Sequence, residues 1–322
     1  MEMRLSDMDR LSWCRLAGQR TTPEASPGGK PMYTITGVTG HVGAVTAHEL
    51  LDRGAPVRAV VRDATKGLAL QQRGAQVVVA DFGDRAALAG ALHGSDGAFI
   101  MLPTVPTAGD AEHRRLADSI AGAVGDSGVA HVVMLSSIGA ELAEGTGPVR
   151  WLHHLENRLR QTGARLTALR SPHFQEKVET LLGAALDTGI YPVFGENADV
   201  PTPMIATRDI GKTAAAALLA PSPTSETVDL LSPEYTERDV AGRLAAVLGK
   251  PLQVVTIPQA GWIEAMLDAG LPAPLAHELA ALYGADQRGL FHPRGDRNHA
   301  CTTEIDETLR HLVQTATGTP AT

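Results

Sequence analysis

The chain has 322 residues, enough to bury a substantial core as one large domain or as one domain with a smaller lobe. Hydrophobic residues make up 43% of it, which is typical of a soluble globular protein. With 28 Lys and Arg against 36 Asp and Glu, the net charge is −8, which argues against sequence-independent binding to nucleic acid or to anionic membranes. We therefore expect a small-molecule partner.

The cysteine content and the N-terminal segment indicate the cellular compartment in which we expect the protein. Cys14 and Cys301 are the only cysteines and stand far apart, so we expect neither a disulfide framework nor a metal site. Residues 1–31 mix charges with Gly, Ser and Pro and lack the apolar run of a signal peptide, which predicts a flexible N-terminal extension. No stretch reaches the roughly 20 apolar residues of a membrane span. The prediction is a cytoplasmic protein.

A glycine-rich turn follows the first predicted strand. The apolar run 32–36 leads into Gly-Val-Thr-Gly-His-Val-Gly at 37–43 and then into a helix-like stretch at 44–52. In such a unit, backbone N–H groups and the positive end of the helix macrodipole favour a bound phosphate without a lysine. The spacing is G-x-x-G-x-x-G and not G-x-G-x-x-G, so a plain strand-turn-helix connection is the alternative.

Each glycine of this turn has a separate expected role. Gly37 permits a sharp turn, Gly40 permits close approach of a pyrophosphate, and Gly43 permits tight packing of the helix on the sheet. The predicted pyrophosphate site consists of Gly37, Thr39, Gly40, His41, Val42 and Gly43.

The alternation of strand and helix continues to residue 171. Further strands are predicted at 57–61, 76–80, 97–102, 131–135 and 165–169, and helices between them at 68–73, 85–92, 111–123 and 149–161. This pattern predicts an α/β fold, a Rossmann-type doubly wound parallel sheet with its ligand crevice at the carboxyl ends of the strands.

Past residue 171 the alternation weakens. A Gly/Pro-rich piece at 189–204 is followed by a helix and a short strand, and then by mostly helical sequence. We predict an NADP-binding Rossmann domain at 32–171 and a smaller, mainly helical substrate-binding lobe at 172–322. Residues 205–231 are expected to return to the Rossmann domain.

The end of the second strand bears on the choice of cofactor. Strand 57–61 runs directly into Arg62, at the place that faces the adenosine ribose in this kind of fold. An arginine there pairs with the 2′-phosphate, so NADPH is favoured over NADH, with Lys66 as a second cation. Asp63 is expected to cap the next helix. An ordinary surface charge is the alternative for Arg62.

The other strand ends supply the remaining predicted cofactor contacts: Asp81, Phe82, Leu102, Pro103, Ser136 and Ser137. The Asp81 carboxylate is expected near the adenine amino group, or else as a turn residue of the loop. Ile138 follows the two serines and is expected to contact the substrate near the nicotinamide.

A proton-donating pair common in dehydrogenases of this type is absent. None of the four tyrosines has a lysine four residues further on, so there is no Tyr-x-x-x-Lys. Leu152 and Glu156 occupy the two positions. Glu156 precedes Arg160 by four residues, which favours a surface ion pair on the helix.

Three histidines are the candidate catalytic residues: His153, His154 and His173. A histidine titrates near neutral pH and can supply a proton to a reduced oxygen, although His153 and His154 point in different directions along their helix. His173 and Phe174 follow the sixth strand, where Phe174 is expected to cover an aromatic substrate. Ordinary packing and capping explain these two residues almost as well.

Five segments together resemble the NmrA-like family of atypical short-chain dehydrogenases/reductases. They are GVTGHVG (37–43), VVRDATKG (60–67), SSIGA (136–140), ALRSPHFQE (168–176) and PTPMIATRDIGKTAA (201–215). The resemblance covers about residues 32–260. It implies that 37–43 holds the pyrophosphate and Arg62 the 2′-phosphate. Similar proteins include NADPH-dependent quinone oxidoreductases, azoreductases and redox-sensing regulators that bind dinucleotide without turnover.

The absence of Tyr-x-x-x-Lys limits the class of substrate that we expect. A reduced quinone is a stabilised anion that water can protonate, whereas a reduced ketone is a basic alkoxide that needs a proton donor. We predict an NADPH-dependent reductase of a quinone-like or conjugated carbonyl compound, monomeric or homodimeric, with no nucleic-acid or membrane partner. A non-catalytic redox sensor and an epimerase or isomerase with bound cofactor are the alternatives.

Overall fold

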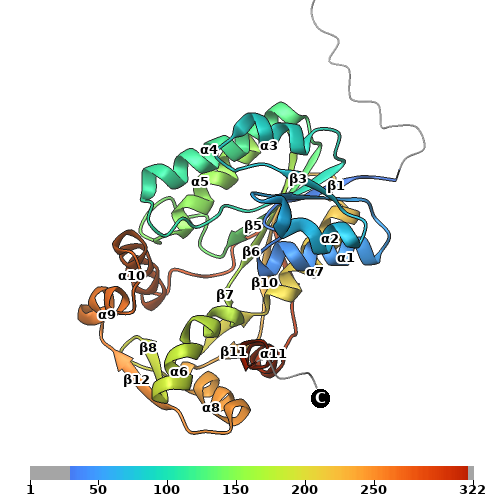
Figure 1. The fold of residues 1–322 in the computed structure, drawn as a ribbon. Helices are drawn as coiled ribbons and strands as arrows, with labels where there is room; N and C mark the ends of the chain where they lie inside the picture. Colours follow the sequence, from blue (N-terminus) through green and yellow to red (C-terminus); the bar gives the residue numbers. More distant parts are fainter. Residues whose placement is uncertain (1–29, 318–322) are drawn as a thin grey trace, which may run out of the picture. The chain divides into compact units, whose positions relative to one another are not determined.

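Eight parallel strands form the central sheet, in the order β13-β10-β6-β5-β4-β1-β2-β3 (Figure 1). The computed structural model describes residues 30–317; Cys14 and the predicted extension, apart from its last two residues, lie outside them. The strands are β1 (Tyr33–Ile35), β2 (Val57–Val61), β3 (Gln76–Val79), β4 (Gly97–Ile100), β5 (His131–Ser137), β6 (Arg165–Ser171), β10 (Glu226–Leu231) and β13 (Arg297–Ala300). The strand order reverses between β1 and β4, and the predicted doubly wound parallel sheet is confirmed.

Helices cover both faces of this sheet (Figure 1). One face packs on α1 (His41–Asp52), α2 (Leu68–Gln72) and α7 (Thr207–Leu219). The other face packs on α3 (Arg85–Leu92), α4 (Asp110–Ser127) and α5 (Val149–Arg160). The central strands are thus buried on both sides, which explains their continuous apolar sequences.

The pairing of α1 with α7 depends on a glycine. A β-carbon at Gly211 would lie 2.6 Å from the β-carbon of Val45, so only glycine allows this approach. Residue 211 belongs to the segment TRDIGKT in α7. The α7 helix packs on the central sheet, and β10, the next element of the chain, is one of the strands of this sheet.

The sequence did not indicate β13. Its residues, Arg297–Ala300, are all exposed and show no apolar alternation, so nothing in the local pattern predicts a strand. It pairs in parallel with β10, so that Val228 is opposite Arg297. The chain therefore returns to the edge of the sheet a second time.

The smaller lobe combines short helices with two small sheets. One apolar core lies among η2 (Gln175–Leu181), α6 (Leu182–Thr188), α8 (Glu237–Leu248) and α11 (Ile305–Thr317). A second core lies between α9 (Trp262–Asp268) and α10 (Ala273–Gln287). The other elements of the lobe are β7 (His173–Phe174), β8 (Ile190–Phe194), β9 (Thr202–Ile205), β11 (Glu234–Tyr235), β12 (Gln253–Ile257) and η3 (Gln259–Gly261), whereas η1 (Ala64–Gly67) follows β2.

Two of these strands lie in the Gly/Pro-rich piece 189–204, where no strand was expected. The β8 strand pairs in parallel with β12, and β9 lies between β7 and β11. Each pairing joins residues far apart in sequence, which local composition cannot reveal. No helix within residues 30–317 is long and apolar enough to cross a membrane.

A buried histidine makes the stability of the fold depend on pH. His131, at the start of β5, is 2% exposed, and its Nε2 hydrogen-bonds with the Thr167 hydroxyl at 3.2 Å. Burial, and next the charge of Arg165, lowers the pKa of His131 from 6.5 to about 4. Between these values the unfolded chain binds more protons than the folded one, so the free energy of unfolding falls as the pH falls.

We therefore expect His131→Gln to remove part of the acid sensitivity. Between pH 7 and pH 4 the wild type should lose about 3 kcal/mol of unfolding free energy more than the variant does, because one pKa unit corresponds to about 1.4 kcal/mol. Urea unfolding at several pH values measures this difference. Parallel losses in the two proteins would contradict the role of His131.

Candidate functional site

The glycine turn after β1 has the geometry expected for a phosphate site. Gly37 has a φ of +65°, which favours glycine. A β-carbon at Gly43 would lie 2.3 Å from the carbonyl oxygen of Gly37, so the first turn of α1 packs directly on the backbone of the preceding turn. A β-carbon at Gly40 would meet only that same oxygen, at 3.6 Å, so open space lies beside Gly40.

The N-terminus of α1 is free to receive an anion. No side chain among residues 30–317 caps the helix, and its first turn contains no acidic residue. The early backbone N–H groups of a helix lack intrahelical partners and attract negative charge. Together with the space beside Gly40, this end of α1 fits the pyrophosphate of a dinucleotide.

The rest of the predicted loop is divided between surface and core. Thr39 and His41 are exposed, whereas Val42 is buried. The His41 Nε2 lies 3.1 Å from a carboxylate oxygen of Glu179 in η2, so the lobe reaches the glycine turn.

The residues after β2 lie on the surface. Arg62 is exposed and has no hydrogen-bond or ion-pair partner among residues 30–317, which leaves its guanidinium available to a ligand. Lys66 is also exposed, on η1. The Asp63 carboxylate accepts a hydrogen bond from the Thr65 backbone N–H at 2.9 Å, which lowers the pKa of Asp63 and confirms the expected cap.

At the next strand end, Asp81 forms a turn within its own loop. Its carboxylate accepts a hydrogen bond from the Gly83 backbone N–H at 2.7 Å, as in the turn alternative. Phe82 packs at the edge of the core, Leu102 is buried and Pro103 is half-buried. Whether these residues line a bound cofactor stays a prediction.

A buried ion pair occupies the place of the missing Tyr-x-x-x-Lys. Glu156 is 3% exposed, and Arg170 from β6 binds both of its carboxylate oxygens, at 2.9 and 3.0 Å. The expected ion pair with Arg160 forms, at 3.8 Å, but its expected place on the surface is wrong, because Glu156 is buried and its closer partner is Arg170. Burial lowers the pKa of Arg170, but the bond and charge of Glu156 outweigh it, and the pKa is raised overall.

This pair also determines which serine is accessible. The Ser136 hydroxyl donates a hydrogen bond to Glu156 at 2.6 Å and is buried. Ser137 donates only to the neighbouring carbonyl of Ile138, at 3.0 Å, and is half-buried. Of the two hydroxyls, that of Ser137 is therefore the more exposed, next to the buried Ile138.

The three histidines lie in different surroundings. His154 faces Asp118 of α4, with Nε2 and a carboxylate oxygen 3.0 Å apart. His153 hydrogen-bonds with the carbonyl of Ala140 at 2.8 Å, in the loop after β5. His173, on β7, has its Nε2 3.4 Å from a carboxylate oxygen of Asp286 in α10. His173 thus lies between the end of β6 and the lobe.

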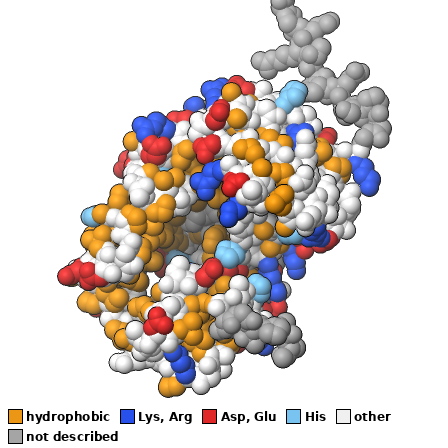
Figure 2. All heavy atoms as spheres, viewed as in Figure 1, with side chains coloured by type: hydrophobic (Ala, Val, Ile, Leu, Met, Phe, Trp, Pro, Cys, Tyr) orange, Lys and Arg blue, Asp and Glu red, His pale blue; other side chains and the backbone are white. Residues whose placement is uncertain are grey.

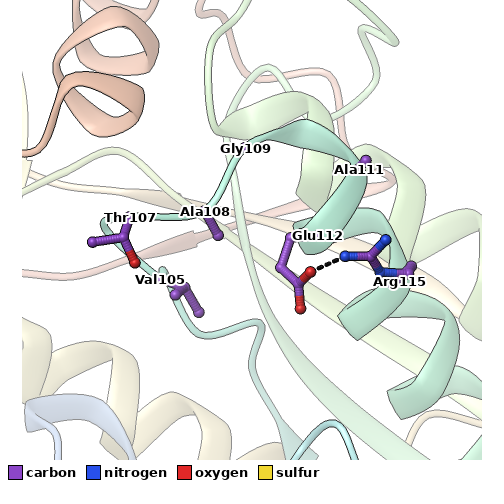
Figure 3. A pocket seen from close by; sticks show the side chains of 7 residues that line it. All are labelled: Val105, Thr107, Ala108, Gly109, Ala111, Glu112 and Arg115. Atoms are coloured by element: carbon purple, nitrogen blue, oxygen red, sulfur yellow. Dashed lines mark hydrogen bonds and ion pairs between the residues drawn. The ribbon is translucent and has the colours of Figure 1, made fainter.

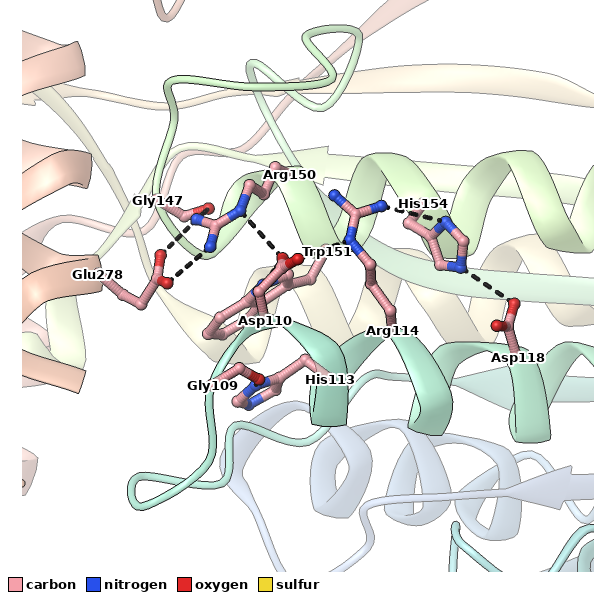
Figure 4. Close-up of polar contacts among 10 residues, drawn as sticks. All are labelled: Gly109, Asp110, His113, Arg114, Asp118, Gly147, Arg150, Trp151, His154 and Glu278. Carbon is pink, nitrogen blue, oxygen red and sulfur yellow. Dashed lines mark hydrogen bonds and ion pairs between the residues drawn. The ribbon is translucent and has the colours of Figure 1, made fainter. Parts of the chain in front are cut away.

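Helix α10 is attached firmly to the loop after β5. Arg150 donates hydrogen bonds to both carboxylate oxygens of Glu278, one of them at 2.6 Å, as Figure 4 shows. A β-carbon at Gly147 would lie 2.3 Å from the backbone oxygen of Glu278, so α10 rests directly on the loop. Arg288 adds a hydrogen bond to the carbonyl of Gly145, at 3.1 Å.

The start of α4 supports this attachment (Figure 4). Asp110 accepts hydrogen bonds from Arg150 at 3.1 Å, Trp151 at 2.9 Å and Arg114 at 2.9 Å. Burial raises the pKa of Asp110, but the bonds from Arg114 and Trp151 lower it overall. His113 stacks on the Trp151 ring at 3.6 Å. One carboxylate thus joins α4 to α5 and, through Arg150, to α10.

Two hollows lie near these elements. A shallow depression of about 510 Å³ at the start of α4 is lined by Val105, Thr107, Ala108, Gly109, Ala111, Glu112 and Arg115 (Figure 3). Asp110 and Glu112 lie in the first turn of α4 and already complement its dipole, so this end does not suit an anion. Figure 2 shows another hollow beside α10, bordered largely by hydrophobic side chains.

The parallel sheet and its glycine turn define a Rossmann-type fold. The chain belongs to the NmrA-like family, whose model matches residues 30–309. This confirms the resemblance seen in the sequence.

Several relatives have named activities. The NAD(P)H azoreductase of Xenophilus azovorans is 28% identical over 254 residues, which cover 78% of this chain and 86% of that protein. A (4-alkanoyl-5-oxo-2,5-dihydrofuran-3-yl)methyl phosphate reductase of Streptomyces griseus is 31% identical over 225 residues, 69% and 76% of the two chains. The structure of an NADPH-dependent quinone oxidoreductase from Escherichia coli, complexed with NADPH, has a TM-score of 0.73 and 26% identity, covering 88% of this chain and all of that one.

Sequence patterns did not reveal the residues that join α10 to the ends of the central strands. Arg150 and Glu278 are 128 positions apart, and Asp286 stands in an ordinary helical pattern. No periodicity marks such pairs. Among the described residues there is also no cluster of three or more His, Cys, Asp or Glu suited to a metal ion.

The glycine turn gives a matched pair of variants. Gly40→Val should weaken NADPH binding about tenfold or more, because the side chain enters the open space, while the melting temperature stays near that of the wild type. Gly43→Ala should instead destabilise the fold by about 1–3 kcal/mol, since the methyl group collides with the backbone. Fluorescence titration and thermal unfolding separate the two effects. Unchanged affinity in Gly40→Val would refute the phosphate site.

Proposed function

We propose that this protein is an NADPH-dependent reductase of planar conjugated acceptors such as quinones. The observation that carries the proposal is the N-terminus of α1, which follows the glycine turn and has no side-chain cap. Relatives of the chain are named as reductases. In this proposal residues 32–171 bind the cofactor, residues 172–322 mostly form the substrate lobe, and 205–231 return to the first domain.

The acceptor class follows from the chemistry shared by the named relatives. An azo compound, a quinone and a 5-oxo-2,5-dihydrofuran each contain a conjugated π system. Hydride addition to such a system gives an anion whose charge is delocalised. A site that lacks a Tyr-Lys pair suits these acceptors, because water is acid enough to protonate the product.

In this proposal, separate groups of residues would bind the cofactor and the acceptor. The N-terminus of α1 holds the pyrophosphate, and Arg62 pairs with the 2′-phosphate, assisted by Lys66. A bound NADPH supplies the hydride. Ser137, the last residue of β5, and His173, on β7 just after β6, would hydrogen-bond with an acceptor oxygen, and Phe174 would lie against the acceptor.

The pair Glu156–Arg170 takes no proton-donating role in this proposal. A carboxylate bound through both oxygens to an always-charged guanidinium has no proton to give at neutral pH. The pair instead holds β6 against α5 behind the reacting groups.

If His173 contacts the acceptor, His173→Asn should lower kcat/KM for quinones without changing NADPH affinity.

An acceptor panel tests the reaction. Purified protein with NADPH should reduce 1,4-benzoquinone with a kcat/KM about 10²–10⁴-fold above that for a simple ketone of similar size, because only the ketone needs a general acid. Loss of absorbance at 340 nm measures turnover. Tight NADPH binding without oxidation by any acceptor would instead support a redox sensor, and turnover of substrate without net oxidation of NADPH would support an epimerase.

A charge-neutral variant tests the cofactor preference. Arg62→Gln should weaken NADPH binding about 10- to 100-fold and leave NADH binding unchanged, because a hydrogen bond between charged groups contributes about 1.5–3 kcal/mol. Arg238→Gln, which removes an exposed arginine paired with Asp199 on the lobe, is the matched control. Equal losses for both cofactors, or none, would remove the role given to Arg62.

A further inference from the structure

Phe291 differs from every other phenylalanine of the chain. Four of the five phenylalanines pack with one of the hydrophobic cores, namely Phe82, Phe99, Phe174 and Phe194. Phe291 belongs to none of these cores and is half-buried. Within residues 30–317 no aromatic ring stacks on it. Burial in a core therefore does not account for this side chain.

The ring of Phe291 rests on a glycine at the reacting end of the sheet. Gly139 has a φ of +91°, and a β-carbon there would lie 2.4 Å from Cδ1 and 2.6 Å from Cε1 of Phe291. Gly139 stands two residues after the end of β5, beside Ser137 and Ile138. Any larger residue at 139 would displace the ring, so the loop is shaped to receive it.

The segment that carries Phe291 is held at both ends. On one side Arg288 donates a hydrogen bond to the carbonyl of Gly145, at 3.1 Å. On the other side Arg294 lies 3.9 Å from a carboxylate oxygen of Glu141. Figure 1 shows this stretch running from α10 toward the sheet. Phe291 is thus fixed beside the loop after β5.

The helix that precedes Phe291 also contacts a residue of the proposed reaction site. His173 and Asp286, 3.4 Å apart, join the end of β6 to the same helix, α10, that precedes Phe291. The face of the molecule beside α10 is hollowed and bordered largely by hydrophobic side chains (Figure 2). Phe291 is half-buried against Gly139, and a partly exposed aromatic ring presents a flat apolar surface to a ligand.

We propose that Phe291 is a specificity-determining residue that forms a wall of the acceptor site and stacks on planar, extended π systems. This inference rests on the proposed function. For hydride transfer, the reacting ring must lie against the nicotinamide. A second, fused ring then extends beyond it toward the wall, where offset stacking on Phe291 stabilises it.

Two quinones of different extent test the proposal. In Phe291→Leu, kcat/KM for 1,4-naphthoquinone should fall about three- to tenfold more than kcat/KM for 1,4-benzoquinone, the range expected for loss of one aromatic contact. Phe291→Tyr should retain the wild-type ratio, because it keeps the ring. NADPH affinity, measured by fluorescence titration, should be unchanged in both variants.

Phe194→Leu is the matched control. Phe194 stacks on Tyr283, with ring centroids 5.5 Å apart, in the core between α9 and α10, so its loss should lower the melting temperature and leave the acceptor ratio unchanged. If Phe291→Leu proves too unstable to assay, Phe291→Met replaces it, with the same expected ratio.

The outcomes are distinguishable. Equal losses for the two quinones, or none, would overturn the role of Phe291 while leaving the reductase intact. Loss of the preference in Phe291→Tyr as well would show that a retained aromatic ring does not preserve it, which also overturns the proposal. A wild-type protein that binds NADPH but reduces no quinone would overturn the proposed function, and this inference with it.

Discussion

The backbone contact between α1 and the turn at Gly37 is the constraint on which much of the fold depends. A β-carbon at Gly43 would lie 2.3 Å from the Gly37 carbonyl oxygen, so α1 begins against the strand it follows. This places the uncapped end of α1 at the crevice. It also places Val45 where α7 can cross it through Gly211. One close approach thus positions the phosphate site and the helix that brings the chain back to the sheet.

Behind the crevice, a buried salt bridge stands where related dehydrogenases need a proton relay. Removing one partner of such a pair costs about 3–5 kcal/mol, because the other charge is left without compensation. Glu156 and Arg170 are therefore held together, and Arg170 also donates to Glu141 at 3.0 Å in the loop after β5. The pair orders this loop and supplies no acid. That arrangement agrees with acceptors whose reduced forms need little help with protonation.

The proposed wall of the acceptor site belongs to the lobe. Arg150 and Glu278, together with the glycine at 147, hold α10 on the loop after β5. Arg150 and Glu278 are far apart in the sequence, but their side chains are in direct contact and partly buried. A wall attached in this way keeps a constant position relative to the strand ends. Phe291, which follows α10, therefore lies at a defined place beside Gly139.

The sequence by itself determined the features that depend on local pattern. The glycine spacing, the alternation of strand and helix and the residue after β2 predicted the doubly wound sheet, the tight turn before α1 and the exposed Arg62. The tertiary structure decided what depends on distant partners. Glu156 was expected on the surface because i,i+4 spacing favours Arg160, but Arg170 on a neighbouring strand draws it inward. The exposed strand β13 and the contact of Phe291 with Gly139 have no local signature, since each forms only when segments far apart in sequence meet.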